Sequence, residues 1–168
     1  SAQLMDPKTA FNTLAILNRV GLDPRRLELE ITETAVMTDA DTAQKIVCEL
    51  RAAGVRISLD DFGTGQSSLG RLRDFTFDKV KIDRAFVSRI SNDKASEHII
   101  KAIVTMCEGL DLAVVAEGIE DFSEALKLKA LGCGMGQGYF YGKPADAVAT
   151  MRYLADRYVT VEGRAASA

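Results

Sequence analysis

Five short runs of strand-forming residues recur along the chain, and helical stretches separate them. We expect strands over residues 27–32, 56–62, 79–83, 113–119 and 136–141. Their starts lie 29, 23, 34 and 23 residues apart, and each interval has room for one strand, one helix and two short loops. This alternation is typical of βα units that build a largely parallel sheet.

The stretches beside these strands have apolar residues at helical spacing. We expect helices over residues 8–20, 39–53, 68–75, 92–108, 123–131 and 147–158. Gly54 follows the second helix, and Ser123 and Asp146 stand at the starts of the last two as capping residues. We expect residues 1–161 to form one domain and residues 162–168 to form a frayed tail.

The chain length limits how such units can close. Repeated βα units build either a barrel or an open doubly wound sheet. A complete (β/α)8 barrel typically needs ~250 residues and rarely has fewer than ~200. With 168 residues, this chain is too short to be a whole barrel.

Composition excludes several classes of protein. A hydrophobic fraction of 47% excludes intrinsic disorder, and a net charge of −3 argues against holding a polynucleotide by bulk charge. The longest apolar run has five residues, 112–116, whereas a membrane span needs ~20, and we see no secretory signal. Three scattered cysteines favour a reducing compartment, and with His98 the single histidine, carboxylates and lysine must carry any chemistry.

Acidic residues stand at or near the carboxyl ends of the expected strands. Glu30 lies in the first, Asp60 and Asp61 in the second, Glu117 in the fourth, and the third carries Lys81. Because the carboxyl ends of parallel strands gather at one face, these side chains should converge there. Clustered carboxylates repel one another without a cation, and an all-oxygen ligand set suits Mg²⁺, Mn²⁺ or Ca²⁺. Taken singly, each acid has an alternative interpretation as a loop-start or helix-capping residue.

Strand alternation adds two expectations. It would send Asp60 and Asp61 to opposite faces, so both serve one site only if the strand ends or twists at Asp61, which Gly63-Thr64-Gly65 permits. Glu28 shares a face with Glu30 but lies deeper. We expect Glu28 to be paired or to lie at a rim, with no catalytic role.

Taken in order, these segments resemble a known family. The segments are Glu30-Ile31-Thr32-Glu33, Asp60-Asp61-Phe62-Gly63-Thr64-Gly65, Lys81-Ile82-Asp83, Ala116-Glu117-Gly118-Ile119-Glu120 and Gln137-Gly138-Tyr139. They look like the successive signatures of EAL domains, the cyclic-di-GMP-specific phosphodiesterases of bacterial signalling, over about residues 1–155. The resemblance implies an α/β fold, the TIM-like (β/α)8 barrel of EAL type, here an incomplete fragment with about five of eight strands. Residues 1–161 would then be a partial EAL domain.

The resemblance also implies an activity and a set of roles. The activity would be metal-dependent hydrolysis of cyclic di-GMP to linear pGpG, with Mg²⁺ or Mn²⁺ as cofactor and two ions in the complete domain. The implied metal ligands are Glu30, Asp60, Asp61 and Glu117. The implied catalytic residues are Lys81, which would hold or activate the attacking water, Gln137, which would contact water or phosphate, and Glu33, which would anchor the loop over residues 63–69. The implied supporting residues are Asp83, Glu120, Gly63, Thr64 and Gly65.

Two motifs of the family are missing from this chain. These are the Glu-Ala-Leu motif and the Asn-x-Ser motif of earlier strands, each of which supplies a metal ligand. Residues 1–4 look like those that directly follow the second motif. We therefore expect the fragment to be inactive or weak by itself. The alternative function is an EAL-like module that binds cyclic di-GMP without hydrolysing it, and a weaker third is an unrelated metal-dependent barrel enzyme.

The resemblance finally implies partners and a location. It implies a homodimer formed through the barrel and sensor or cyclase domains in the parent chain. We expect no DNA partner and no membrane contact for this segment. The domain would be cytoplasmic, even in a parent chain that is anchored in a membrane elsewhere.

Overall fold

The computed structural model describes residues 6–63 and 75–165, leaving out the side chains of residue 37 and residues 157–165. Its strands are β1 (Glu28–Thr32), β2 (Arg56–Phe62), β3 (Lys79–Ile82), β4 (Ala113–Ala116) and β5 (Met135–Gly136). They form one sheet in the order β1-β2-β3-β4-β5, and every neighbouring pair is parallel. This order has no switch point, so it favours a barrel wall over an open doubly wound sheet.

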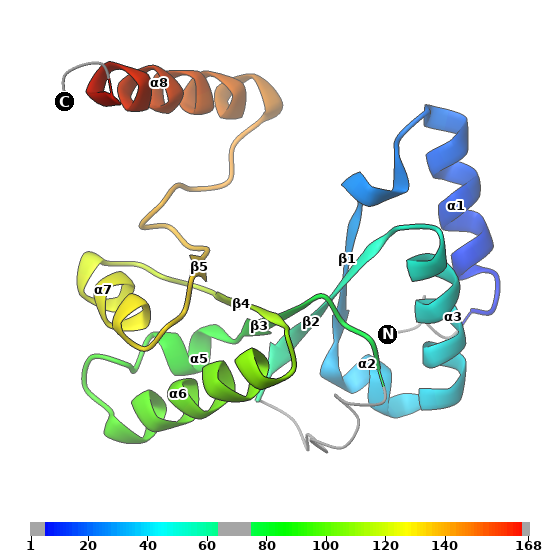
Figure 1. Cartoon of the computed structure of the whole chain (residues 1–168), viewed down its shortest axis with the longest axis horizontal. Coiled ribbons are helices and arrows are strands. Elements are labelled where there is room, and N and C mark those ends of the chain that lie inside the picture. Colours follow the sequence, from blue (N-terminus) through cyan, green and yellow to red (C-terminus); the bar gives the residue numbers. More distant parts are fainter. Residues whose placement is uncertain (1–5, 64–74, 166–168) are drawn as a thin grey trace.

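Helices connect the strands, as Figure 1 shows. They are α1 (Thr9–Val20), the 3-10 helix η1 (Pro24–Arg26), α2 (Glu33–Thr38), α3 (Ala40–Ala52), α5 (Arg84–Val87), α6 (Lys94–Gly109), α7 (Phe122–Ala130) and α8 (Ala147–Ala165). Aspartates begin most of them. For example, the side chains of Asp39, Asp93 and Asp121 accept hydrogen bonds from backbone N–H groups in the first turns of α3, α6 and α7.

One face of the sheet is apolar and lies against the helices. Ile57, Val80 and Ile82 point to this face and are fully buried. α3 packs on β2 through residues such as Leu50, and α6 packs on β4 through residues such as Val104. Burying a side chain of this size stabilises the fold by about 1.5–3 kcal/mol, so this layer is the core.

The other face of the first three strands is polar. It carries Glu28, Glu30, Ser58, Asp60, Lys79 and Lys81, which alternate with the core residues along each strand. Such alternation places charged side chains side by side on the inner face while the outer face stays apolar. The candidate site is built at the carboxyl end of this polar face.

The C-terminal segment is largely exposed. Every residue from Gly134 to Asp156 is exposed except Gly138, which is partly buried. α8 stands apart from the sheet in Figure 1, and Met151 and Val148 on it are 68% and 62% exposed. Among the described residues, no helix combines the length and the apolar character needed to cross a membrane.

The expected fifth strand over residues 136–141 is wrong beyond Gly136. After β5 the chain turns, and Tyr141 N donates a hydrogen bond to Gly138 O at 3.0 Å. A Cβ atom on Gly138 would lie 2.1 Å from Ile119 O, so the chain crosses residue 119 at a distance that only glycine allows. The aromatic residues predict a strand, but this close crossing ends it.

Other expectations differ in their bounds. β3 and β4 end one and three residues earlier than expected, at Ile82 and Ala116. The short helices α2 and α5 were not expected, since each follows directly from a strand and has six residues or fewer. Residues 162–165 belong to α8 and not to a frayed tail. The expected helix over residues 68–75 lies outside the described residues except for its last one.

Candidate functional site

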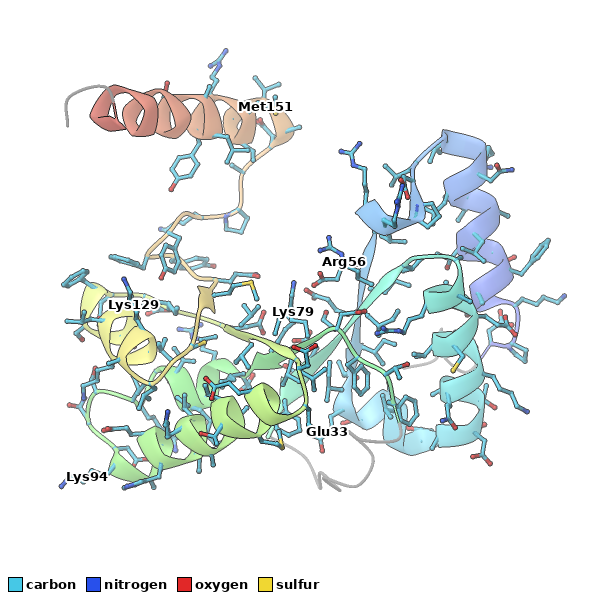
Figure 2. All side chains as sticks on the ribbon, in the orientation of Figure 1. Glu33, Arg56, Lys79, Lys94, Lys129 and Met151 are labelled. Carbon is cyan, nitrogen blue, oxygen red and sulfur yellow. The ribbon has the colours of Figure 1, made fainter. Side chains whose placement is uncertain are left out.

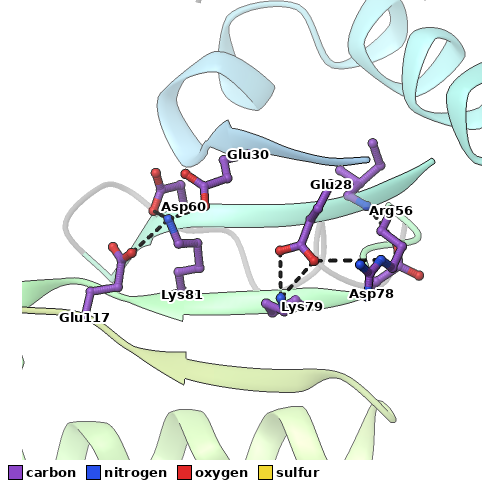
Figure 3. A network of polar contacts seen from close by, with 9 residues as sticks. Glu28, Glu30, Arg56, Asp60, Asp78, Lys79, Lys81 and Glu117 are labelled. Atoms are coloured by element: carbon purple, nitrogen blue, oxygen red, sulfur yellow. Dashed lines mark hydrogen bonds and ion pairs between the residues drawn. The ribbon is translucent and has the colours of Figure 1, made fainter. Parts of the chain in front are cut away.

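A lysine lies at the centre of the converging carboxylates. Lys81 Nζ is 2.8 Å from Glu30 Oε1, 3.1 Å from Asp60 Oδ1 and 2.8 Å from Glu117 Oε1 (Figure 3). We call these four residues the Lys81 cluster. The Lys81 side chain is only 6% exposed, whereas that of Glu30 is 51% exposed. The expected convergence of these acids around Lys81 is therefore what the structure shows.

The sheet register explains how these residues meet. Glu30, Asp60 and Lys81 come from three adjacent strands and point to the same polar face. Glu117 directly follows β4, and its backbone N–H donates to Ile82 O at 3.1 Å, which holds it beside the end of β3. All four side chains thus meet at the carboxyl end of the sheet, where parallel βα folds build their sites.

The charge state of Lys81 follows from its surroundings. Burial favours loss of its proton, but hydrogen bonds to Glu117, Glu30 and Asp60 outweigh burial and raise the pKa of Lys81 above its ordinary value. Lys81 is therefore an ammonium ion at neutral pH. In this state it donates hydrogen bonds and does not accept a proton.

Glu117 has the opposite balance. Burial raises the pKa of its carboxyl group, and the nearby charges of Asp60 and Glu30 act in the same direction, against the lowering effect of Lys81. One ammonium therefore compensates the three carboxylates of the cluster only in part. The cluster retains an excess of negative charge.

Asp61 lies next to the cluster in an unusual backbone conformation. Its φ angle is 56°, and the pairing of β2 with β3 shifts register between Leu59 and Phe62. The irregularity that would let Asp60 and Asp61 serve one site is thus present. Burial, followed by the charges of Asp60 and Asp83, raises the pKa of the Asp61 carboxyl group. The Asp61 carboxyl group therefore holds its proton more strongly than an exposed aspartate does.

Glu33 is a buried carboxylate beside the end of β1. It is 4% exposed, its Oε2 accepts a hydrogen bond from Gly63 N at 3.4 Å, and its Oε1 has no hydrogen-bond partner among the described residues. Gly63 has a φ of 96°, and a Cβ atom there would lie 3.0 Å from the Phe86 ring. The contact joins Glu33 to the first residue of the expected loop, and Thr64 and Gly65 lie outside the described residues.

Gln137 and Glu120 lie on the other side of Glu117. Both line a pocket of about 280 Å³ together with Arg84, Glu117, Gly118, Gly138 and Tyr139. Arg84 Nη2 donates a hydrogen bond to Glu120 Oε1, and Asp83 Oδ1 accepts from Ala85 N at 2.8 Å as the cap of α5. Asp83 and Glu120 therefore sit beside the cluster without contacting Lys81.

Arg84 is the residue of this pocket that sequence reasoning missed. It crosses over Gly118, where a Cβ atom would lie 2.3 Å from Arg84 Cγ. The available signal was its position, directly after Lys81-Ile82-Asp83 and facing the Glu117-Gly118 segment across the sheet.

A second charged pair lies deeper on the same polar face. Lys79 Nζ is 2.7 Å from Glu28 Oε1 and 2.8 Å from Glu28 Oε2, and Arg56 Nε is 4.0 Å from Glu28 Oε2. We call these three residues the Lys79 cluster. Glu28 is thus paired, as expected.

The donor chemistry of the site fits a divalent cation. The available donors at this edge are carboxylate oxygens, which Mg²⁺, Mn²⁺ and Ca²⁺ prefer, and three of these carboxylates share the single ammonium of Lys81. Within the described residues, no three His, Cys, Asp or Glu side chains are already arranged to hold a metal ion. The Lys81 ammonium stands between the carboxylates instead.

Comparison with known proteins gives consistent matches. The model of the family described as "EAL domain" matches residues 1–144. The bifunctional diguanylate cyclase/cyclic di-GMP phosphodiesterase MucR of Pseudomonas aeruginosa is 43% identical over 131 residues, which are 78% of this chain and 19% of MucR. The curated relatives compared are matched over 16–36% of their length.

Solved structures resemble the chain closely. The Pseudomonas aeruginosa MucR phosphodiesterase in complex with cyclic di-GMP matches with a TM-score of 0.85 and 38% identity, over 88% of this chain and 60% of that one. Klebsiella pneumoniae BlrP1 in complex with manganese and cyclic di-GMP matches with a TM-score of 0.79 and 34% identity, over 85% of this chain and 36% of that one.

Proposed function

The chain belongs to the EAL domain family and has part of its TIM-like barrel, and from this premise we propose that it contributes to a metal-dependent phosphodiesterase that converts cyclic di-GMP to linear pGpG. In this reaction a water molecule attacks phosphorus, the bond from phosphorus to one 3′ oxygen breaks, and the phosphate stays on the 5′ oxygen of the linear product. The activity in the name of MucR and the cyclic di-GMP in the solved MucR complex support this substrate.

One observation carries the proposal. Carboxylates from β1, β2 and the end of β4 converge on one buried lysine at the carboxyl end of a parallel sheet. A purely structural ion pair needs one carboxylate for each ammonium, whereas the Lys81 cluster has three. Such an excess of acids at this end of the fold is the arrangement that metal-dependent phosphoryl chemistry uses.

Glu30, Asp60, Asp61 and Glu117 would hold the cation. When bound, divalent ions would supply the positive charge that stabilises the attacking and leaving oxygens of an in-line displacement. The manganese complex of the BlrP1 relative supports a divalent ion, and we propose Mg²⁺ or Mn²⁺ here. Asp61 would reach the site through its left-handed backbone conformation, which departs from strict strand alternation.

The remaining residues would orient the reactants. Lys81, as an ammonium, would hold the attacking water by donating a hydrogen bond. Gln137, which is exposed at the rim of the pocket beside Glu117, would contact water or phosphate. Glu33 would anchor the loop that begins at Gly63, and Arg84 would hold Glu120 at the pocket mouth.

We also propose that this chain alone is inactive or weak. The 51% exposure of the Glu30 side chain supports this, because among the described strands β1 pairs only with β2 and has no strand on its other edge. A homodimer through the barrel and a cyclase or sensor domain in the same protein are further proposals. The two activities in the name of MucR support the second of these.

The test is chromatographic detection of pGpG after incubation of cyclic di-GMP with Mg²⁺ or Mn²⁺. It uses the chain joined to the upstream strands of its domain, beside the same protein with Lys81→Ala. We expect product from the first and a loss of at least about 100-fold in the second, because Lys81 contacts three site carboxylates.

The matched control is Lys129→Ala. Lys129 is an exposed lysine of α7, well separated from Lys79 in Figure 2, so its removal should leave hydrolysis unchanged. Bound but unhydrolysed cyclic di-GMP in the unsubstituted protein would contradict the phosphodiesterase and favour the sensor function. No binding at all would contradict both.

A further inference from the structure

Two lysines of β3 lie on the same polar face, and each reaches a different glutamate of β1. Lys81 Nζ lies 2.8 Å from Glu30, and Lys79 Nζ lies 2.7 Å from Glu28. Figure 3 shows the Lys79 and Lys81 clusters as two separate groups along the sheet. Lys79 and Lys81 are only two residues apart on the strand, so their ammonium groups could exchange glutamates. Some feature of the fold must therefore keep each ammonium with its own carboxylate.

The strand register is not that feature. Lys79 is paired with Ser58, and Ser58 is paired with Glu30, so these three residues form one row across β1, β2 and β3. Glu28 belongs to the next row, with Arg56. By register alone, the carboxylate opposite Lys79 is Glu30 and not Glu28. Neighbouring strands are ~4.8 Å apart, so an extended lysine can reach across this row.

The middle of the row carries a hydrogen-bonding group that could take part in such a move. Ser58 is fully buried, and its Oγ has no hydrogen-bond partner among the described residues. A Lys79 ammonium that turned along the row would meet this free acceptor as well as Glu30. Within the part of the chain that the structure describes, the two contacts from Lys79 Nζ to Glu28, at 2.7 Å and 2.8 Å, hold it in the deeper row.

We propose that Glu28 is a positioning residue that holds the Lys79 ammonium away from Glu30, so that Lys81 alone contacts the site carboxylates. Without Glu28, Lys79 turns toward Glu30 and takes up oxygens that the site needs. The inference rests on the proposed function only where it treats Glu30 as a metal ligand.

Arg56 makes the proposal testable because it gives Glu28 a second cationic neighbour, whereas Glu28 is the carboxylate that Lys79 contacts. Arg56 Nε lies 4.0 Å from Glu28 Oε2. After Lys79→Met, Glu28 keeps this cationic neighbour and the site is undisturbed. After Glu28→Gln, Lys79 loses its carboxylate and the next one within reach is Glu30. An ion pair that serves stability alone predicts similar effects of the two substitutions.

The decisive experiment is carbon-13 NMR of the Glu30 side-chain carboxylate in the metal-free chain. The Glu30→Gln variant assigns the signal, and amide spectra show that each variant is folded. We expect Glu28→Gln to shift the Glu30 signal, Lys79→Met to leave it unchanged, and Glu28→Gln with Lys79→Met to return it to its original position. An unshifted signal in Glu28→Gln, or equal shifts in both single variants, overturns the proposal.

A titration with Mn²⁺ followed by electron paramagnetic resonance gives the second readout. Glu28→Gln should weaken Mn²⁺ binding about tenfold, as removal of groups behind metal ligands commonly does, and the added Lys79→Met should restore it. Restored binding would support the role of Glu28 even if no pGpG is ever formed. A failure of the Glu28 proposal can therefore be told apart from a failure of the proposed phosphodiesterase function. In a chain that takes up no Mn²⁺, the NMR comparison alone decides.

Discussion

The sheet from β1 to β4 and the segment from β5 to α8 contain similar residues but differ in what surrounds them. In the first region, aliphatic side chains such as Ile57 and Val80 are completely buried. In the second, Tyr139, Val148 and Met151 are 58%, 62% and 68% exposed. Helix formation in α8 therefore depends on local propensity and capping, whereas the sheet region depends on packing. The difference separates the buried residues that stabilise the fold from the exposed residues that contribute little to its stability.

The largest expected effect is in the packed region. Ile57→Ala removes a fully buried side chain of β2 and should lower the free energy of unfolding by about 2–5 kcal/mol in urea denaturation. Met151→Ala on α8, which Figure 2 shows standing clear of the sheet, should change it by no more than about 0.5 kcal/mol. Comparable losses in the two variants would show that α8 is packed in solution, which breaks the comparison.

The next effect lies at the border of the two regions. Gly118 has a φ of 70°, and a Cβ atom would lie 2.3 Å from Arg84 Cγ, so Gly118→Ala should cost about 1–3 kcal/mol and separate Arg84 from Glu120. Thermal unfolding measures the loss. Gly134→Ala is the matched control, because a Cβ atom there meets nothing within 4 Å. An unchanged thermal stability of Gly118→Ala would mean that Arg84 does not stay packed against residue 118 in solution.

One helix in each region begins with an aspartate cap. Asp93 caps α6 through Ala95 N at 2.9 Å, and Asp146 caps α8 through Ala149 N at 2.8 Å. Asp93→Ala should lower the global free energy of unfolding by about 1 kcal/mol, because α6 is packed on the sheet. Asp146→Ala should reduce helical circular dichroism without moving the global transition. A global loss from Asp146→Ala would again place α8 within the cooperative unit.

The smallest expected effect is a gain. The pKa of Asp61 is raised from its ordinary value of 3.8, so the unfolded chain loses this proton first and stability falls as pH rises from about 4 through the folded-state pKa. Asp61→Asn should remove that fall and make the protein slightly more stable at pH 7. Urea denaturation at pH 4 and pH 7 measures the difference.

Asp111→Asn is the matched control for this substitution. Asp111 has the same φ of 56° but is exposed, so it tests the backbone conformation without the neighbouring carboxylates. An equal gain in both variants would trace the effect to backbone preference, and burial with Asp60 and Asp83 would no longer explain it.

These contrasts also show what the sequence could predict. Strand alternation predicted that Glu28 and Glu30 share one face of β1, and the strand ends predicted that Glu30, Asp60 and Glu117 meet near Lys81. Both are consequences of local geometry. The pairing of Glu28 was also predictable, because a glutamate deep on a half-buried face requires a partner.

The remaining features depend on contacts between distant residues. Alternation cannot show that Lys81 stands at the centre of the acids, since that depends on side-chain reach across three strands. It cannot show the end of β5 at Gly136, which follows from the crossing over Ile119. The sequence also could not predict that the apolar side of α8 is exposed, because an amphipathic helix has the same sequence pattern with or without a neighbour.

The position of Lys81 has a consequence for how charge is balanced at this edge of the sheet. Many small metal-binding domains stay unfolded until an ion neutralises their ligands. Here one ammonium of the chain itself contacts three of the carboxylates. Part of the neutralisation is thus built into the polypeptide, so we expect a chelator to destabilise this region less than it would destabilise a site formed by carboxylates alone.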